Sequence, residues 1–196
     1  MKQLGFDLIL LGAPAAGKNT QADLLMKCYV LNPVETGKYL RALMEKNDAV
    51  ARKLRETTGV GNPAPVKIIK DYISERVAHA RPAENLLFIG NPRLKPEAQY
   101  LKKLLHARRR DFLAFYITLP EKEILRRVRS RNENRIDDDL RFAKNRIRYH
   151  NTQVKKTIGY FTKLHKIRLI RGNQPIRKVY ADINRAINDY QRSTRN

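Results

Sequence analysis

The sequence is poor in cysteine and has no long hydrophobic run. The single cysteine, Cys28, excludes an intramolecular disulfide framework and a cysteine-based zinc site. We expect Cys28 on the buried face of the first helix, where it would act as a small hydrophobic residue. No apolar run is long enough to cross a bilayer, and the first residues lack the pattern of a secretion signal. We therefore expect a cytoplasmic protein without a membrane partner.

Acidic residues are also scarce. The chain has 19 Asp and Glu against 41 Lys and Arg, a formal net charge of +22, so an anionic partner is expected. That partner is either a polyphosphate bound by arginines, or RNA or another polyanion. The basic runs at residues 102–103, 108–110 and 155–156 are more simply explained as solvated helix faces. Aromatic residues are not interleaved with them, as they would be in a single-strand binder.

Residues 12–20 read GAPAAGKNT and follow the apolar run at residues 6–11. This order predicts a strand, a phosphate-binding loop and a helix. Gly12 and Gly17 allow the backbone amides to turn inward, and Lys18 can reach the outer phosphates of a nucleotide. The usual pattern fails by one position, because Asn19 follows the lysine and the magnesium-binding hydroxyl comes at Thr20. The expected ligand is a nucleotide polyphosphate.

The rest of the chain alternates short apolar runs with amphipathic stretches, which predicts one α/β domain over residues 1–196 with a parallel sheet covered on both faces. Further strands are expected at residues 86–89, 112–118 and 167–170. Asn32 and Pro33 interrupt the helical pattern of the first helix, and a small helical excursion is expected over residues 32–66. Further helices are expected near residues 66–77, 96–106, 120–131, 140–154, 158–164 and 176–190. The polar segment 131–139 is expected to be an exposed loop.

Phosphoryl transfer requires cations that hold two anionic groups in line and neutralise the charge of the moving phosphoryl group. Planar guanidinium groups fork onto phosphate oxygens and suit this task. Six arginines stand at the ends of predicted elements or at loop edges: Arg41, Arg93, Arg127, Arg131, Arg135 and Arg146. Each alone is typical of a surface residue, and their collective placement suggests the reaction.

Five ordered segments resemble the adenylate kinases, members of the nucleoside monophosphate kinase family, over nearly the whole chain. GAPAAGKNTQADLL is similar to their GxPGxGKGTQxxxL segment, ETGKYLRA to STGDMLRA, and IGNPRLKPEAQYL to DGFPRTxxQAxxL. RIDDDLRFAKNRIRYH resembles RxDDxxxxxxxRLxxY, and RGNQPIRKVYADI resembles DGxxxxxxVxxxI. The resemblance implies a P-loop three-layer α/β/α fold, a small helical monophosphate-binding excursion at 32–66 and a short lid at 129–140.

The resemblance also implies roles for individual residues. Lys18, Arg93, Arg131, Arg135 and Arg146 would be catalytic, and Thr20 would bind Mg²⁺ together with waters. ATP would be bound by Gly12, Ala13, Pro14, Ala15, Ala16, Gly17, Lys18, Asn19, Thr20, Arg127 and Gln174. The acceptor AMP would be bound by Thr36, Gly37, Arg41, Gly90, Arg93, Glu97, Arg135 and Arg146. The implied enzyme is a phosphotransferase that acts as a monomer.

One departure from the family pattern concerns magnesium. The family has an aspartate that helps to hold the waters around the ion, and Ile89 stands at that position. Either Thr20, the phosphates and waters suffice, or Asp137 and Asp138 contribute from the lid, or catalysis is weak. Within the loop, Ala15 and Asn19 replace glycines and restrict the backbone.

A second departure concerns the acceptor base, because Glu97 replaces the glutamine that contacts it. An ionised glutamate only accepts hydrogen bonds, which suits guanine better than adenine; alternatively Glu97 points to solvent. AMP remains the preferred acceptor, because Thr36 and the resemblance to the adenylate kinases favour it. The leading hypothesis is ATP + AMP ⇌ 2 ADP with Mg²⁺. The alternatives are a kinase with GMP as acceptor and a catalytically weakened kinase-fold protein that binds nucleotides and RNA.

Overall fold

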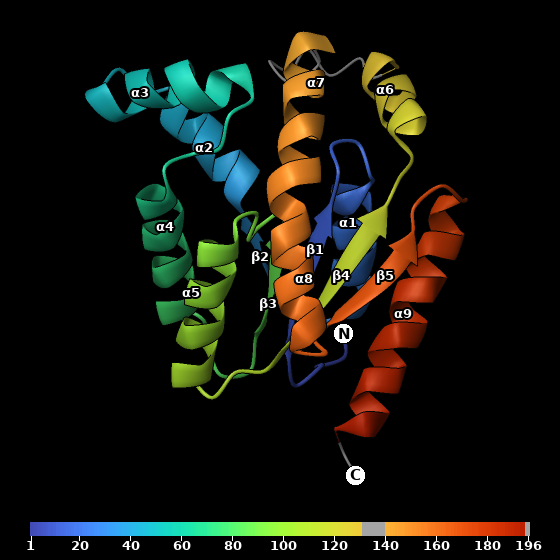
Figure 1. Ribbon diagram of the computed structural model, residues 1–196. Helices are drawn as coiled ribbons and strands as arrows, with labels where there is room; N and C mark the ends of the chain where they lie inside the picture. Colours follow the sequence, from blue (N-terminus) through green and yellow to red (C-terminus); the bar gives the residue numbers. More distant parts are fainter. Residues whose placement is uncertain (131–139, 195–196) are drawn as a thin grey trace.

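The computed structural model describes residues 1–130 and 140–194. Its centre is a five-stranded sheet in which all neighbouring strands are parallel, in the order β2-β3-β1-β4-β5 (Figure 1). The strands are β1 (Asp7–Gly12), β2 (Leu31–Glu35), β3 (Asn85–Ile89), β4 (Phe112–Thr118) and β5 (Ile167–Arg171). The parallel α/β fold predicted from the sequence is confirmed.

Helices cover both faces of the sheet and connect its strands. They are α1 (Lys18–Cys28), α2 (Thr36–Met44), α3 (Ala49–Thr57), the 3-10 turn η1 (Thr58–Val60), α4 (Val66–Ala78), α5 (Lys95–Ala107), α6 (Glu121–Arg129), α7 (Leu140–Tyr149), the π-helical turn η3 (His150–Val154), α8 (Lys155–Lys163) and α9 (Ile176–Ser193). Among the described residues, no helix combines the length and the apolar character that a membrane crossing requires.

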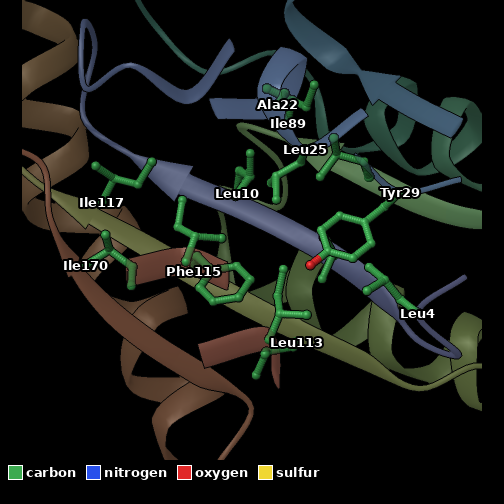
Figure 2. Close-up of a cluster of buried hydrophobic side chains, with 14 of the residues drawn as sticks. Leu4, Leu10, Ala22, Leu25, Tyr29, Ile89, Leu113, Phe115, Ile117 and Ile170 are labelled. Carbon is green, nitrogen blue, oxygen red and sulfur yellow. The ribbon is translucent and has the colours of Figure 1, made fainter. Parts of the chain in front are cut away.

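The continuous apolar run of β1 is explained by burial on both faces, as in other parallel sheets. Leu8 and Leu10 point into the cluster under α1 and α9, part of which Figure 2 shows. Ile9 and Leu11 point into a second cluster, to which α2, α3, α4, α5 and α8 contribute. Because neighbouring residues alternate between the two clusters, all four are at most 1% exposed.

We predicted that residues 32 and 33 interrupt the regular structure, but they are part of a strand. Both residues lie in β2, which pairs with β3 from Leu31↔Asn85 to Glu35↔Ile89. Pro33 is tolerated because β2 is the edge strand, where one side of the backbone needs no amide donor. The helical segment that follows therefore begins at Thr36, directly at the carboxyl end of this strand.

Two other expectations need correction. Cys28 is exposed rather than buried, because it ends α1 and the next residue, Tyr29, takes the buried place with 8% exposure. The two helices predicted at 140–154 and 158–164 are one continuous rod, in which η3 joins α7 to α8. The π-helical turn inserts an extra residue into the helical repeat, which blurs the apolar periodicity there.

Candidate functional site

The site lies at the carboxyl edge of the sheet, where the segments after β1, β2 and β3 meet. The strands are in register, with Leu10 beside Ile89 and Glu35 beside Ile89. The phosphate-loop segment after β1, α2 after β2 and the segment after β3 therefore start side by side. Ligands of open parallel sheets bind at this edge, outside the carboxyl ends of the strands.

Lys18 is the first residue of α1, and its side chain bonds back to the start of the loop. Its Nζ donates to the backbone oxygens of Gly12 at 2.9 Å and Ala13 at 2.8 Å. Gly17, immediately before the helix, has φ 86°, a left-handed conformation that glycine adopts without steric cost. The loop thus presents an ammonium group and the amino end of a helix at one place, which is an arrangement suited to phosphate.

The two non-glycine residues in the loop are accommodated differently. Ala15 has φ 57°, the left-handed region that costs an alanine roughly 1–2 kcal/mol. Its methyl group packs against a small apolar cluster that includes Ile124 and Val128 of α6, and this contact offsets part of the strain. Asn19 lies inside α1, where no positive φ is needed, so its side chain is compatible with the loop.

A pocket joins the loop after β1 to the segment after β3. It is lined by Leu11, Gly12, Pro14, Lys18, Gly90, Arg93, Tyr149, His150 and Val154. The Arg93 guanidinium is held at the wall of this pocket, because its Nε donates to the oxygen of Gly90 in the same segment at 2.9 Å. A Cβ on Gly90 would lie 3.6 Å from Lys18 Cε and 3.8 Å from Arg93 Nη2. Gly90 thus separates two cations, which converge on one space.

Arg127 of α6 spans the other side of the loop. Its guanidinium donates to the oxygens of Ala15 at 3.4 Å and of Gly172, after β5, at 3.2 Å. Glu123 holds it at 2.7 Å, and the hydrogen bonds from Arg126 and Arg127 lower the pKa of Glu123 to about 2. The structure therefore places Arg127 between the loop and the β5–α9 connection.

Glu97 is buried and does not point to solvent, so that alternative is wrong. Its Oε2 accepts from the backbone N–H of Arg93 at 2.8 Å and of Leu94 at 3.1 Å, and the side chain is part of the amino-terminal cap of α5. Burial raises the pKa of this carboxyl, although the two backbone donors and the nearby charge of Arg93 oppose the shift. Glu97 therefore positions the segment that carries Arg93.

Three buried polar atoms close to this pocket lack a hydrogen-bond partner in the part of the chain that the structure describes. They are Thr36 Oγ1, Asn91 Oδ1 and the Tyr149 hydroxyl. Burial strongly raises the pKa of Tyr149, and the negative charge of Glu97 adds to the effect. Buried polar groups are nearly always paired, so an orphaned set beside a pocket indicates a polar ligand.

Ile89, at the end of β3, is part of the apolar cluster under α1 and is only 7% exposed (Figure 2). Its side chain offers no ligand for a cation. Within the described ranges, no group of three or more His, Cys, Asp or Glu residues is placed to hold a metal ion. Thr20 lies in the first turn of α1, directly after the loop, and is exposed.

Of the remaining predicted residues, some are described by the structure and others are not. Gly37 and Arg41 lie on α2, where a Cβ on the glycine would be 3.5 Å from Arg41 Nη1. Gln174 lies between β5 and α9 and donates to Asp182 at 2.7 Å. Arg131, Arg135, Asp137 and Asp138 lie outside the described residues. For Arg146 only its place in α7 is described.

Sequence reasoning missed Tyr149 and His150, which line the pocket from the junction of α7 and η3. His150 Nε2 is 2.8 Å from the hydroxyl of Tyr116 in β4, and the two rings are stacked. Both residues end the segment RIDDDLRFAKNRIRYH, whose arginines drew attention instead. The family pattern of this segment ends in a tyrosine that aligns with His150, so the pattern marked the position of His150 but not that of Tyr149.

Comparison with known proteins gives a consistent result. The model of the family described as "Adenylate kinase" matches residues 10–166. The adenylate kinase of Parabacteroides distasonis is 29% identical over 186 residues, which cover 93% of this chain and 98% of that protein. Those of Bacteroides fragilis and Brucella abortus are 26% and 28% identical over 184 and 189 residues, with 92% of this chain and 97% of each relative covered.

Proposed function

Since the chain belongs to the adenylate kinase family, and is a nucleoside monophosphate kinase and hence a phosphotransferase, we propose that its reaction is ATP + AMP ⇌ 2 ADP with Mg²⁺. The phosphoryl group passes directly between the nucleotides, without a covalent intermediate on the protein. We further propose that the protein acts in the cytoplasm as a monomer.

The convergence of Lys18 and Arg93 on one pocket carries this proposal. Lys18 and the loop amides bind the β- and γ-phosphates of ATP, and Thr36, Arg41 and Arg93 bind AMP. Arg127 lies against ATP, and the lid arginines with Arg146 complete the charge around the transferring group. The chemistry is positioning and charge neutralisation, for which these cations are suited. A lid that closes also excludes water and limits hydrolysis of ATP.

The described residues fit a magnesium ion that arrives with ATP. Thr20 is exposed on the first turn of the helix that follows the phosphate loop, and its hydroxyl would be the one protein ligand among them, beside phosphate oxygens and waters. Mg²⁺ commonly keeps several waters and takes few protein ligands. When bound, the ion neutralises charge on the β- and γ-phosphates. Ile89 contributes nothing to it.

The acceptor is AMP in this proposal, and GMP is the second candidate, favoured by one observation. Glu97 is buried at the acceptor side with Oε2 engaged by two backbone amides, so an ionised carboxylate offers only acceptor capacity to a base. The orphaned hydroxyls of Thr36 and Tyr149 are donors or acceptors as needed, and they are consistent with either base.

A phosphotransfer assay with a panel of nucleoside monophosphates tests the proposal. ATP is supplied with AMP, GMP, CMP or UMP, with and without Mg²⁺, and the diphosphates are measured. We expect ADP formation from AMP that depends on Mg²⁺. Faster turnover of GMP than of AMP would identify GMP as the acceptor. No turnover of any monophosphate would contradict the proposal and favour the nucleotide-binding alternative.

A further inference from the structure

Two neighbouring parts of the fold, α5 and the rod α7–η3–α8, carry more basic than acidic residues. The rod α7–η3–α8, residues 140–163, contains seven Lys and Arg and no Asp or Glu. Beside it, α5 has a single acidic residue, Glu97, which is buried. The helices α5 and α8 are in contact and lie next to each other on the sheet (Figure 1).

We call this surface the basic face and define it by six exposed side chains: Lys102 and Lys103 of α5, and Arg148, Lys155, Lys156 and Lys163 of the rod. Along the rod, the exposed positions 148, 152, 155, 159 and 163 follow each other at intervals of three or four residues. Within α8, positions 155, 159 and 163 lie along one side of the helix, and the exposed residues 148 and 152 precede them at and before the π-helical turn η3. Thr152 and Gly159 separate the cations with small side chains, so the row is unobstructed.

The six cations are not neutralised within the part of the chain that the structure describes. None of them takes part in an ion pair there. Two other helices carry mixed charges: exposed Lys67 of α4 is paired with Asp71 at 2.7 Å, and α9 has Asp182 and Asp189 among its arginines. On the basic face, exposed cations of two neighbouring elements therefore lie without an acidic partner among the described residues.

The dimensions favour an extended partner. From residue 148 to residue 163 the rod rises about 22 Å, at about 1.5 Å per residue. One strand of a nucleic acid duplex presents a phosphate about every 3.4 Å along its axis, so the length of the row corresponds to about six phosphate spacings. A single nucleotide would contact only a small part of it.

The surroundings distinguish between polyanions. Among the side chains whose burial is described, the exposed large apolar ones other than Met1 are Val50, Val60, Leu169 and Ile176. None of these belongs to α5 or to residues 147–163 of the rod, so this part of the face lacks the apolar residues that anchor a helix in a membrane. The tyrosines of α5 and of the described part of the rod, Tyr100, Tyr149 and Tyr160, are all half-buried, so none of them presents an open ring for stacking unpaired bases. The contacts available are those to a phosphate backbone.

The breadth of the face separates RNA from DNA. A helix with its side chains is about 10–12 Å wide, so two packed helices are too broad for the major groove of B-DNA, which is about 12 Å wide. An RNA duplex has a wide, shallow minor groove bordered by phosphates, which a flat face can cover. We propose that the basic face of α5 and the α7–η3–α8 rod binds double-stranded RNA through its phosphates, without sequence preference.

Binding of a labelled 20-base-pair RNA, measured by fluorescence anisotropy over a range of salt concentrations, tests the proposal. One variant combines Lys103→Glu, Lys155→Glu and Lys163→Glu. The matched control combines Arg177→Glu, Lys178→Glu and Arg185→Glu on α9, which changes the net charge equally on another helix. We expect the first variant to bind at least about 30-fold more weakly and to lower the salt slope by about 3, since each phosphate contact contributes about 0.9. The control should change affinity less than threefold.

Three further arms make the result specific. Duplex RNA should bind more tightly than single-stranded RNA of the same length and than duplex DNA. Saturating ATP, added at constant ionic strength and constant free Mg²⁺, should leave RNA binding unchanged, because the phosphate loop is not used. Equal losses in the two variants, tighter binding of DNA, or competition by ATP would overturn the proposal. So would binding to anionic vesicles alone. Phosphotransfer by both variants should equal that of the wild type, so this test is independent of the proposed reaction.

Discussion

The two ends of the sheet differ in how their polar groups are satisfied. At the amino edge, near Asp7 and Asn85, polar side chains are bonded to one another and to the backbone. At the carboxyl edge, near Gly12 and Gly90, cations converge and Thr36, Asn91 and Tyr149 keep buried polar atoms without a partner among the described residues. The comparison suggests that one edge holds the fold together and the other is built for a ligand.

The amino edge is organised around Asp7. Its carboxylate receives two hydrogen bonds from Arg110, at 2.9 and 2.6 Å, and one from the backbone of Leu86 at 2.7 Å. Burial raises the pKa of Asp7, and Arg110 opposes that shift. The Asn85 side chain accepts from the backbone of Leu4 at 3.1 Å. These bonds tie the first residues and two segments of the chain together.

Removing Arg110 should have the largest effect on stability. Arg110→Ala leaves the carboxylate of Asp7 buried without its cation, which costs about 3–5 kcal/mol. The exposed neighbour provides the control, because Arg108→Ala should change stability by less than about 0.5 kcal/mol. Urea unfolding followed by circular dichroism measures both. Equal stability of the two variants would contradict a structural role for the amino edge.

Removing Lys18 should have the opposite effect: a large loss of activity with little loss of stability. Lys18→Ala is expected to lower kcat of ADP formation by roughly 10² to 10³, or more, because a positioned cation at the phosphates is lost. The fold should persist, as judged by circular dichroism. Lys27→Ala, at the exposed end of the same helix, should leave kcat unchanged. Wild-type turnover by Lys18→Ala would show that phosphoryl transfer does not use this loop.

Glu97 should affect both stability and the choice of acceptor base. Glu97→Ala should cost about 1–2 kcal/mol, because the backbone amides of Arg93 and Leu94 lose their acceptor, whereas Glu97→Gln should keep the cap. Burial raises the pKa of Glu97, so it takes up a proton at a higher pH than an exposed glutamate. A protonated carboxyl offers a donor and an acceptor, as glutamine does.

The ratio of kcat/KM for AMP to that for GMP should therefore rise as the pH falls in the wild type. It should be high and independent of pH in Glu97→Gln. Initial rates between pH 5.5 and 8 provide the test. A pH-dependent ratio that persists unchanged in Glu97→Gln would assign the effect to another group.

Tyr149 gives the smallest expected effect. Tyr149→Phe removes a hydroxyl that has no described partner in the free protein, so stability should stay the same or rise by up to about 1 kcal/mol. The KM for the acceptor should rise about 2- to 10-fold, as for one lost hydrogen bond. The control is Tyr29→Phe, whose hydroxyl donates to Asn184 at 2.7 Å; it should cost about 1 kcal/mol and leave KM unchanged. A destabilising Tyr149→Phe would mean that its hydroxyl is already satisfied.

Much of this arrangement could be predicted from the sequence, because local patterns determine it. The strand at 112–118 was placed to the residue, and the turn after the first strand was evident from Gly12, Gly17 and Lys18. The strand β2 was not predicted, since Pro33 indicates a break and only its edge position makes it acceptable. The cap formed by Glu97 and the pocket position of His150 depend on packing between distant segments, which spacing alone does not reveal.

Hydrogen–deuterium exchange of the wild-type protein, with and without ADP and Mg²⁺, tests most directly that the carboxyl edge is the nucleotide site. We expect slower exchange in peptides that cover residues 12–20, 36–41 and 89–93, and unchanged exchange in peptides that cover residues 4–7 and 108–112. Protection confined to the amino edge, or no protection at residues 12–20 under saturating ADP, would contradict this assignment.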